Sequence, residues 1–149
     1  MLPLDLLKKG DILPFLKLPE VSGGTVTFSK FRGRRSLVLL LTHSADCALC
    51  AEKLQELHEA LDQLRSEDAE VMAIVPGPPQ QGMELQRRLA LAFPVLNDDG
   101  RLPSDHAVLV VTDRFGEIFA IWRAGQEHRL PTVAEIAGEL AFIALQCPE

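Results

Sequence analysis

The feature that most constrains this chain is the stretch from residue 36 to residue 64, where an apolar run, a short loop and two cysteines follow one another. Residues 36–41 read Ser-Leu-Val-Leu-Leu-Leu, which is typical of a strand buried on both faces of a parallel or mixed sheet. A polar, turn-like segment follows, and Cys47-Ala-Leu-Cys50 then opens an amphipathic segment. We therefore expect a buried strand, a loop, and a helix over residues 47–65 whose first turn carries both thiols.

The two thiols are expected to differ in accessibility. Cys50 begins a line of apolar residues at alternating spacings of four and three, the pattern of a helix face turned toward a core; the line continues through Leu54, Leu57, Leu61 and Leu64. Cys47 would lie at the exposed helix N-terminus, where the partial positive charge of the helix favours a thiolate. The pattern therefore predicts Cys47 as the reactive sulfur and Cys50 as its shielded partner, with Ser44 and Asp46 as alternative helix N-caps.

Composition narrows the class of protein. The chain has 149 residues and a net charge of -6 without a clustered basic face, so we expect one domain over residues 1–149 and no nucleic-acid partner. The apolar runs are far shorter than the ~20 residues that span a membrane, and the N-terminus does not read as a signal peptide. Three cysteines, an odd number, do not suggest a secreted disulfide framework. These observations predict a cytoplasmic protein that does not bind membranes.

The remaining pattern alternates strands with helices before ending in a hairpin and a helix. We expect strands at 25–28, 37–41, 70–75, 93–96, 107–112 and 117–122, and helices at 80–92 and from the capping box Thr132-Val-Ala-Glu135 onward. Met83, Leu85, Leu89 and Ala92 are the expected inward positions of the helix at 80–92, and Val133, Ile136, Leu140, Ile143 and Ala144 form the expected apolar face of the last helix. This order predicts an α/β thioredoxin-like fold, a central mixed β-sheet flanked by helices, with an N-terminal extension.

Three further segments, in the same order and spacing around the cysteine pair, carry a family resemblance. They are Gly-Asp-Ile-Leu-Pro-Phe at 10–15, Gly-Thr-Val-Thr-Phe-Ser-Lys-Phe-Arg-Gly at 24–33 and Asp-Arg-Phe-Gly-Glu-Ile at 113–118. Together they resemble the peroxiredoxins of the alkyl hydroperoxide reductase and thiol-specific antioxidant group, over residues 10–125. The resemblance implies that Cys47 matches the peroxidatic cysteine and that Ser44 matches the hydroxyl position of the family's P-x-x-x-T/S-x-x-C motif.

The chain departs from that family pattern at two positions. Leu40 stands where the motif has its proline. Ala107 stands where the family has its essential arginine, and also where thioredoxin-like relatives have a cis-proline. The resemblance therefore implies an incomplete peroxidase apparatus.

Other candidate residues near the cysteines allow more than one reading. His43 is either a residue that polarises a thiol or an exposed loop histidine, and His106 is either a partial substitute for the missing arginine or a surface residue. Cys147 is either a resolving or intermolecular cysteine or a tail thiol without a role. Only one pair of closely spaced ligands exists for zinc, so no metal is expected.

The sequence thus favours a thiol-dependent oxidoreductase of peroxiredoxin-like or thioredoxin-like type. Cys47 would attack a peroxide or a substrate disulfide, Cys50 would resolve the product, and an external dithiol would reduce the resulting disulfide. Cys47, Cys50 and Ser44 are the predicted catalytic residues, no cofactor is expected, and a homodimer is left open. The alternative is a catalytically degenerate binding or redox-sensing module that has kept the cysteine pair.

Overall fold

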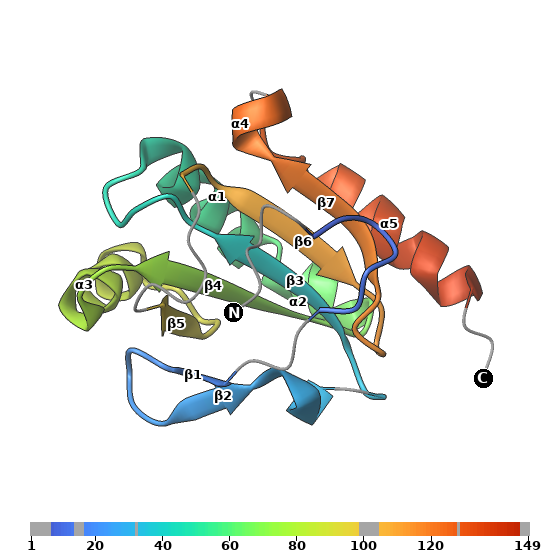
Figure 1. Ribbon diagram of the computed structural model, residues 1–149, viewed down its shortest axis with the longest axis horizontal. Coiled ribbons are helices and arrows are strands. Elements are labelled where there is room, and N and C mark those ends of the chain that lie inside the picture. Colours follow the sequence, from blue (N-terminus) through green and yellow to red (C-terminus); the bar gives the residue numbers. More distant parts are fainter. Residues whose placement is uncertain (1–6, 14–16, 32, 99–104, 128, 147–149) are drawn as a thin grey trace.

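A computed structural model describes residues 7–13, 17–31, 33–98, 105–127 and 129–146. Its elements follow one another in an alternating order (Figure 1). They are β1 (Lys17–Pro19), β2 (Thr25–Thr27), the 3-10 helix η2 (Phe28–Phe31), β3 (Ser36–Leu41), α1 (Ala48–Glu59), α2 (Leu61–Ser66), β4 (Ala69–Pro76), α3 (Pro79–Leu89), β5 (Val95–Asp98), β6 (Val108–Thr112), β7 (Ile118–Arg123), α4 (Ala124–Glu127) and α5 (Val133–Gln146).

The central sheet has five strands in the order β5-β4-β3-β6-β7. Strand β3 pairs in parallel with β4 and antiparallel with β6, so the sheet is mixed, and its middle strand leads directly into the cysteine pair. Every residue of β3 is buried, as the apolar run predicted. The thioredoxin-like fold with a central mixed sheet is therefore confirmed.

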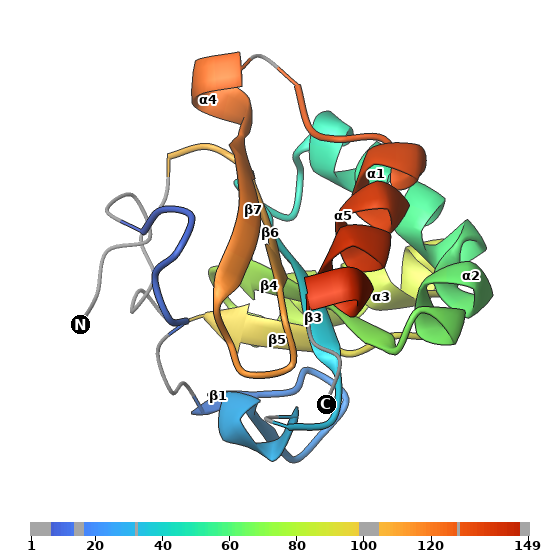
Figure 2. The same ribbon diagram turned by 90° about the vertical axis from the view of Figure 1, so that its right-hand side faces the viewer.

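Two hydrophobic cores lie on opposite faces of this sheet. Alternate residues of β3 separate between them, because successive side chains of a strand point to opposite faces; Val38 and Leu40 join the first core, and Leu37, Leu39 and Leu41 join the second. The first core includes Cys50 and lies under α1, α2, α3 and α5, which Figure 2 shows on one side of the sheet. The second core is covered by the N-terminal part of the chain, including Leu13, Leu18 and Phe28.

The N-terminal extension also pairs with the edge strand of the sheet. Gly10 and Leu13 donate backbone N–H groups to the carbonyls of Ile118 and Gly116, at 2.8 Å each, and Ile118 donates back to Asp11 at 2.8 Å. Farther along β7, the Arg123 guanidinium donates to the carbonyl of Leu7. Residues 7 and 8 are not helical, and Lys9 and Gly10 form a turn.

The helix predicted over residues 47–65 is two helices. The backbone leaves helical geometry at Ala60, with φ of -96° and ψ of 7°, so α1 ends at Glu59 and α2 begins at Leu61. The predicted apolar line nevertheless stays continuous across the break. All five of its members are buried: Cys50, Leu54, Leu57, Leu61 and Leu64.

The predicted inward face of α3 was partly wrong. Met83 is 49% exposed and Ala92 lies exposed beyond the helix, whereas Gly82 and Leu85 face the sheet. A Cβ at Gly82 would lie 3.1 Å from Val21 Cγ1, so the helix packs closely here because it has no side chain. The helix ends early because Ala90 adopts the left-handed conformation, with φ of 52°.

Strand β5 lies at Val95–Asp98, closer to the C-terminus than the predicted range 93–96. The strand continues past its predicted end at residue 96 through Asn97 and Asp98, and both residues are buried. The Asn97 amide donates to the carbonyl of Gly77 at 2.8 Å, which satisfies a polar side chain inside the fold. The proline-rich segment 76–79 belongs to three elements. Pro76 is the last residue of β4, residues 77 and 78 form a loop, and Pro79 is the first residue of α3.

Helix α5 begins as predicted with a reciprocal capping box. Glu135 N–H donates to Thr132 Oγ1 at 3.1 Å, and Thr132 N–H donates to Glu135 Oε1 at 2.9 Å. Ile136, Leu140 and Ile143 are buried, but Val133 is only half-buried and Ala144 is exposed. No helix in the described ranges is both long and apolar enough to span a membrane.

Candidate dithiol site

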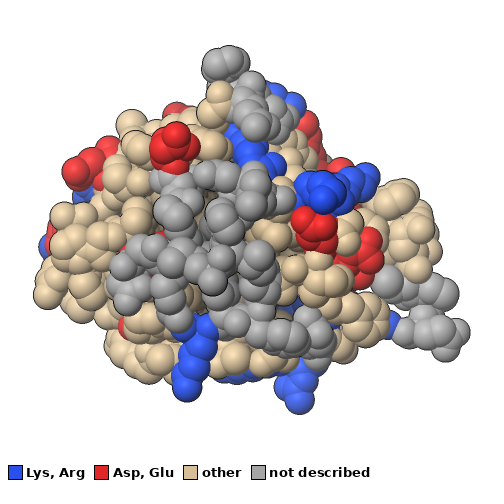
Figure 3. All heavy atoms as spheres, viewed as in Figure 1, with Lys and Arg blue, Asp and Glu red and all other residues tan. Residues whose placement is uncertain are grey.

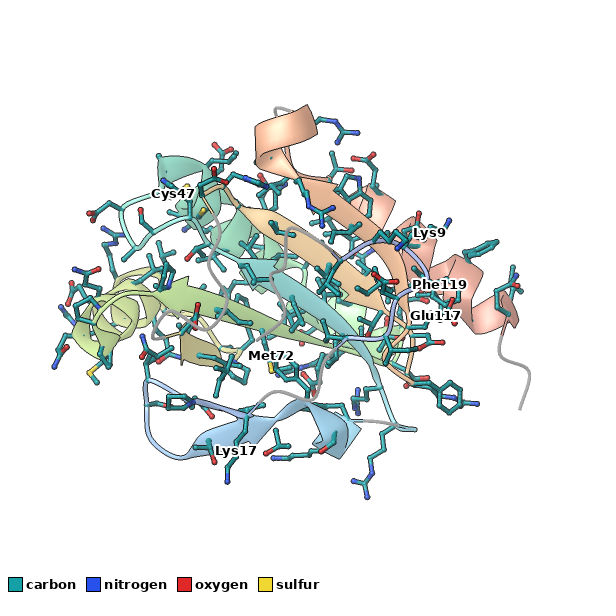
Figure 4. The ribbon with its side chains drawn as sticks, viewed as in Figure 1. Lys9, Lys17, Cys47, Met72, Glu117 and Phe119 are labelled. Carbon is teal, nitrogen blue, oxygen red and sulfur yellow. The ribbon has the colours of Figure 1, made fainter. Side chains whose placement is uncertain are left out.

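The site lies at one end of the sheet, where β3 leaves and β6 enters. Leu41 of β3 pairs with Val108 of β6, so the residues just beyond these strand ends, 42–44 and 105–107, flank the same edge. Cys47 lies at this end, beside the start of α1 (Figure 4). Thr42 stays within the sheet because its N–H donates to the Ile74 carbonyl at 2.9 Å, which fixes the point at which the loop departs.

Cys47 is itself the N-cap of α1. Its backbone is extended, with φ of -70° and ψ of 114°, and its Sγ accepts the Cys50 N–H at 3.2 Å. The expectation that Ser44 or Asp46 caps the helix was therefore wrong, because the cysteine sulfur fills the position that a hydroxyl or carboxylate oxygen usually takes. The sulfur is half-buried and lies where the helix dipole stabilises negative charge.

Cys50 is the shielded sulfur of the pair, 1% exposed and part of the first core. Burial raises the pKa of its thiol to about 12, and its hydrogen bond with Cys47 acts in the same direction. The backbone N–H groups of His43 and Ser44 oppose this rise, and the His43 N–H lies 3.4 Å from the sulfur. Cys50 is thus a protonated thiol at neutral pH, placed to donate to Cys47.

Ser44 contacts Cys47 through its backbone. Its carbonyl accepts the Cys47 N–H at 3.3 Å and closes the turn before the helix, and its side chain is half-buried. Within the described residues, no hydrogen bond joins the Ser44 hydroxyl to either sulfur. The side chain of His43 is exposed, so this residue also acts on Cys50 through its backbone.

Ala107 is enclosed by the core that contains Cys50. It is 2% exposed, and its carbonyl accepts the Ala124 N–H at 2.9 Å, which ties the start of β6 to the start of α4. Cys47 and Ala124 pack against the same core. Ala107 is therefore a small buried residue in the same core as Cys50.

Sequence reasoning had singled out His106 but not its neighbour Asp105. His106 Nδ1 lies 2.6 Å from Asp105 Oδ1, and this contact holds the pKa of the Asp105 carboxyl below its usual range. The imidazole also packs on α4, because a Cβ at Gly125 would lie 2.9 Å from His106 Cγ. The adjacent Asp and His were the available signal, but only the fold places them at the sheet edge where β3 ends.

A cavity of about 230 Å³ opens between α3 and the loop that precedes Cys47. Its walls include Asp46, Gln80, Glu84 and Arg88. On the face of the molecule in Figure 3, acidic and basic side chains are interspersed rather than gathered by sign.

Among the described residues, no three His, Cys, Asp or Glu side chains are grouped as a metal site would require. Cys47 and Cys50 are free thiols, and Cys147 lies outside the described residues.

The fold and the site together define a dithiol protein of the thioredoxin superfamily. The sheet is mixed and five-stranded, one cysteine lies half-buried at a helix N-cap, and a second, buried cysteine follows three residues later. The sequence model of the AhpC/TSA family matches residues 9–136, and the chain belongs to that family. This membership confirms the peroxiredoxin-like resemblance.

Individual relatives agree with this assignment. The chain is 28% identical to peroxiredoxin Bcp of Escherichia coli over 116 residues. This aligned region covers 78% of this chain and 66% of the relative. In fold it is similar to a reduced 2-Cys peroxiredoxin of Plasmodium vivax, with a TM-score of 0.79 at 19% identity over 93% of this chain and 97% of the other. It is also similar to the thioredoxin domain of a thiol-disulfide oxidoreductase of Bacteroides vulgatus, with a TM-score of 0.71 at 11% identity over 91% and 97%. The chain spans about two thirds of the length of its curated peroxiredoxin relative.

Proposed function

We propose that this protein is a thiol-dependent oxidoreductase in which Cys47 is the nucleophile and Cys50 the resolving thiol. The observation that carries the proposal is the asymmetry of the pair: Cys47 is half-buried at the N-cap, whereas Cys50 is 1% exposed and lies within hydrogen-bond distance. A dithiol of this kind attacks with the outer sulfur and closes a disulfide with the inner one. Membership of the AhpC/TSA family supports the same chemistry.

The substrate is a peroxide or a disulfide. With a peroxide, the Cys47 thiolate attacks one oxygen, the O–O bond breaks, the other oxygen leaves as water or an alcohol after protonation, and Cys47 becomes a sulfenic acid. With a disulfide, the thiolate displaces one sulfur and forms a mixed disulfide. Cys50 then attacks the Cys47 sulfur and displaces water from the sulfenic acid, or the remaining substrate thiol from the mixed disulfide. An external dithiol reduces the resulting Cys47–Cys50 disulfide and is itself oxidised. We retain a cytoplasmic location and Ser44 as a positioning residue as parts of the proposal.

A binding or redox-sensing module is the second candidate, and Ala107 is the observation that favours it. A small, buried residue at that position supplies no guanidinium to polarise a peroxide. One preorganised charged donor contributes roughly 10²–10³ in rate. A sensor needs only slow oxidation, whereas an efficient peroxidase needs such a donor or a replacement for it.

One experiment separates these candidates. The reduced protein is mixed with hydrogen peroxide, an alkyl hydroperoxide or a small organic disulfide, and the loss of thiols is followed with time by quenching and mass spectrometry. Wild type should lose two thiols, the Cys50→Ser variant should stop at a sulfenic acid or mixed disulfide on Cys47, and the Cys47→Ser variant should not react. Turnover in the presence of excess dithiol supports the enzyme, whereas oxidation without turnover supports the sensor.

A further inference from the structure

The cavity between α3 and the loop before Cys47 borders the nucleophile of the proposed reaction. Its walls include Ala45 and Asp46. Asp46 directly precedes Cys47 in the chain, so the Cα atoms of these two residues are about 3.8 Å apart. Leu85 lines the cavity from α3 and belongs to the first core, against which Cys47 also packs. The cavity and the half-buried cysteine therefore share one loop and one core.

Helix α3 forms a long wall of this cavity. Gln80, Glu84 and Arg88 are spaced by four residues and so lie one above another on a single helix face, over a length of roughly 12 Å. Leu85 and Ala45 add apolar surface between the polar groups. Drug-sized ligands occupy cavities of roughly 300–1,000 Å³. A cavity of about 230 Å³ therefore suits a smaller molecule, or one end of a molecule, about the size of an amino acid.

The two sides of the cavity carry opposite charges. Asp46 lies on the loop side, and Arg88 lies on α3. Within the described part of the chain, neither of these side chains belongs to an ion pair, whereas Glu84 is already paired with Arg87. An anion would be repelled by Asp46 and a cation by Arg88. The arrangement is complementary to a ligand that carries both a carboxylate and an ammonium group.

We propose that this cavity binds the amino-acid end of a small disulfide, an inference that rests on the proposed function and names its substrate class. The ligand's carboxylate contacts the Arg88 guanidinium, and its ammonium group contacts the Asp46 carboxylate. The substrate is thus a disulfide of cysteine, or of a short cysteine derivative that keeps both charges. Arg88 and Asp46 are the residues that determine this specificity.

The reaction of such a ligand follows the order of the two cysteines. The Cys47 thiolate attacks the ligand sulfur nearer the cavity, the ligand S–S bond breaks, and the outer half leaves as a thiolate that takes a proton from water. Cys50 gives its proton to water and attacks the Cys47 sulfur. The intrachain S–S bond forms, and the inner half leaves as a second thiol. The ligand gains two electrons and the cysteine pair loses two, which the external dithiol later restores.

The test compares four disulfides that differ in charge. L-Cystine carries both charges, cystamine only ammonium groups, N,N′-diacetylcystine only carboxylates, and 2-hydroxyethyl disulfide none. Thiol loss from the reduced protein, in a Cys147→Ser background, is followed by quenching and mass spectrometry while the rate is proportional to disulfide concentration. Each rate is divided by that of the same disulfide with free dithiothreitol, which removes differences in intrinsic reactivity. We expect L-cystine to exceed 2-hydroxyethyl disulfide about tenfold, because each exposed charge contact contributes up to about fivefold.

Three variants assign the preference to the cavity. Arg88→Gln should lower the rate with L-cystine about three- to fivefold and leave that with 2-hydroxyethyl disulfide unchanged. Asp46→Asn should lower the ratio of the same two rates by a similar factor, and this ratio cancels any change in the reactivity of Cys47 itself. Arg65→Gln, at an exposed position of α2, removes the same charge outside the cavity and should leave the ratio unchanged.

A ligand that cannot react separates binding from chemistry. Cystathionine is the thioether analogue of cystine, and it should shift the nuclear magnetic resonance signals of the cavity residues in the Cys47→Ser variant, more weakly once Arg88→Gln is added. Absence of such binding overturns the binding site. Equal normalised rates for all four disulfides, or an equal fall for L-cystine and 2-hydroxyethyl disulfide in Arg88→Gln, overturn it as well and leave the dithiol chemistry intact. Failure of the thiols to react with any disulfide or peroxide instead overturns the proposed function.

Discussion

At the residue scale, the chemistry of the site comes from unequal environments of two identical side chains. Cys47 takes the N-cap position and accepts a backbone N–H, whereas Cys50 is enclosed by the first core. Cys47 remains accessible because it stands at the end of the helix, whereas Cys50, three residues farther along the same helix face, lies in the core. Ala107 is also defined by its environment, because its small side chain fills a buried position.

Alkylation should therefore distinguish the two cysteines. In the reduced protein at pH 7–8, iodoacetamide should modify Cys47 well before Cys50, because Cys50 is buried and its thiol has a pKa of about 12. Mass spectrometry of peptides taken at successive times measures both rates. A faster Cys50, or equal rates, would reverse or remove the assigned roles.

Placing an arginine at position 107 should lower the free energy of unfolding. Ala107→Arg places a long charged side chain at a site that is 2% exposed, so the free energy of unfolding should fall by about 1–3 kcal/mol or more. Ala141→Arg, at an exposed position of α5, is the matched control and should change it by less than about 0.5 kcal/mol. Urea denaturation of both variants gives the comparison. If both variants changed the free energy of unfolding by the same small amount, the side chain at position 107 would have ready access to solvent, contrary to this account.

At the element scale, the sequence was most informative where a pattern has one physical meaning. The apolar run of β3 and the capping box of α5 were predicted because burial and helix capping each demand specific residues. The break at Ala60 and the face of α3 were missed, since tertiary packing decided them: Gly82, a poor helix former, is the residue that approaches the sheet.

The candidate site shows the same division. Cys47 and Cys50 could be recognised from their spacing, and their relative burial followed from the apolar line. Sulfur as the N-cap could not be read from residue preferences, which favour Ser44 or Asp46. The position of Asp105 and His106 at the sheet edge where β3 ends depends on the pairing of β6 with β3, which sequence order does not specify.

The capping box of α5 gives a pH dependence with a defined sign. Hydrogen bonds from Arg129 lower the pKa of Glu135 to about 2 from 4.5. The carboxylate therefore stabilises the fold above about pH 4.5, and this contribution is lost as the pH falls toward 2. Thermal unfolding from pH 7 to pH 2 should show the stability of wild type converging with that of Glu135→Gln. A constant difference for Glu135→Gln would contradict the linkage.

At the scale of the whole molecule, the sheet is covered by helices on one face and by the N-terminal extension on the other (Figure 2). The extension is thus part of the second core rather than an appendage. Leu13 is 5% exposed within that core, whereas its neighbour Ile12 is 52% exposed. This contrast makes the role of the extension measurable.

Leu13→Ala should destabilise the protein by about 2–5 kcal/mol, the usual cost of a buried leucine. Ile12→Ala is the matched control and should change the free energy of unfolding by less than about 0.5 kcal/mol, because its side chain faces solvent. Denaturant titration at one temperature measures both. Similar effects in the two variants would show that the extension does not belong to the core.

The central claim, that Cys47 and Cys50 form one local redox unit, is tested most directly by mapping the disulfide. The protein is oxidised mildly, digested without reduction, and its peptides are identified by mass spectrometry. We predict a Cys47–Cys50 disulfide within one chain, with Cys147 left as a free thiol, because the Cys50 N–H already lies 3.2 Å from Cys47 Sγ. A dominant Cys47–Cys147 disulfide, or the survival of both Cys47 and Cys50 as thiols, would contradict the account.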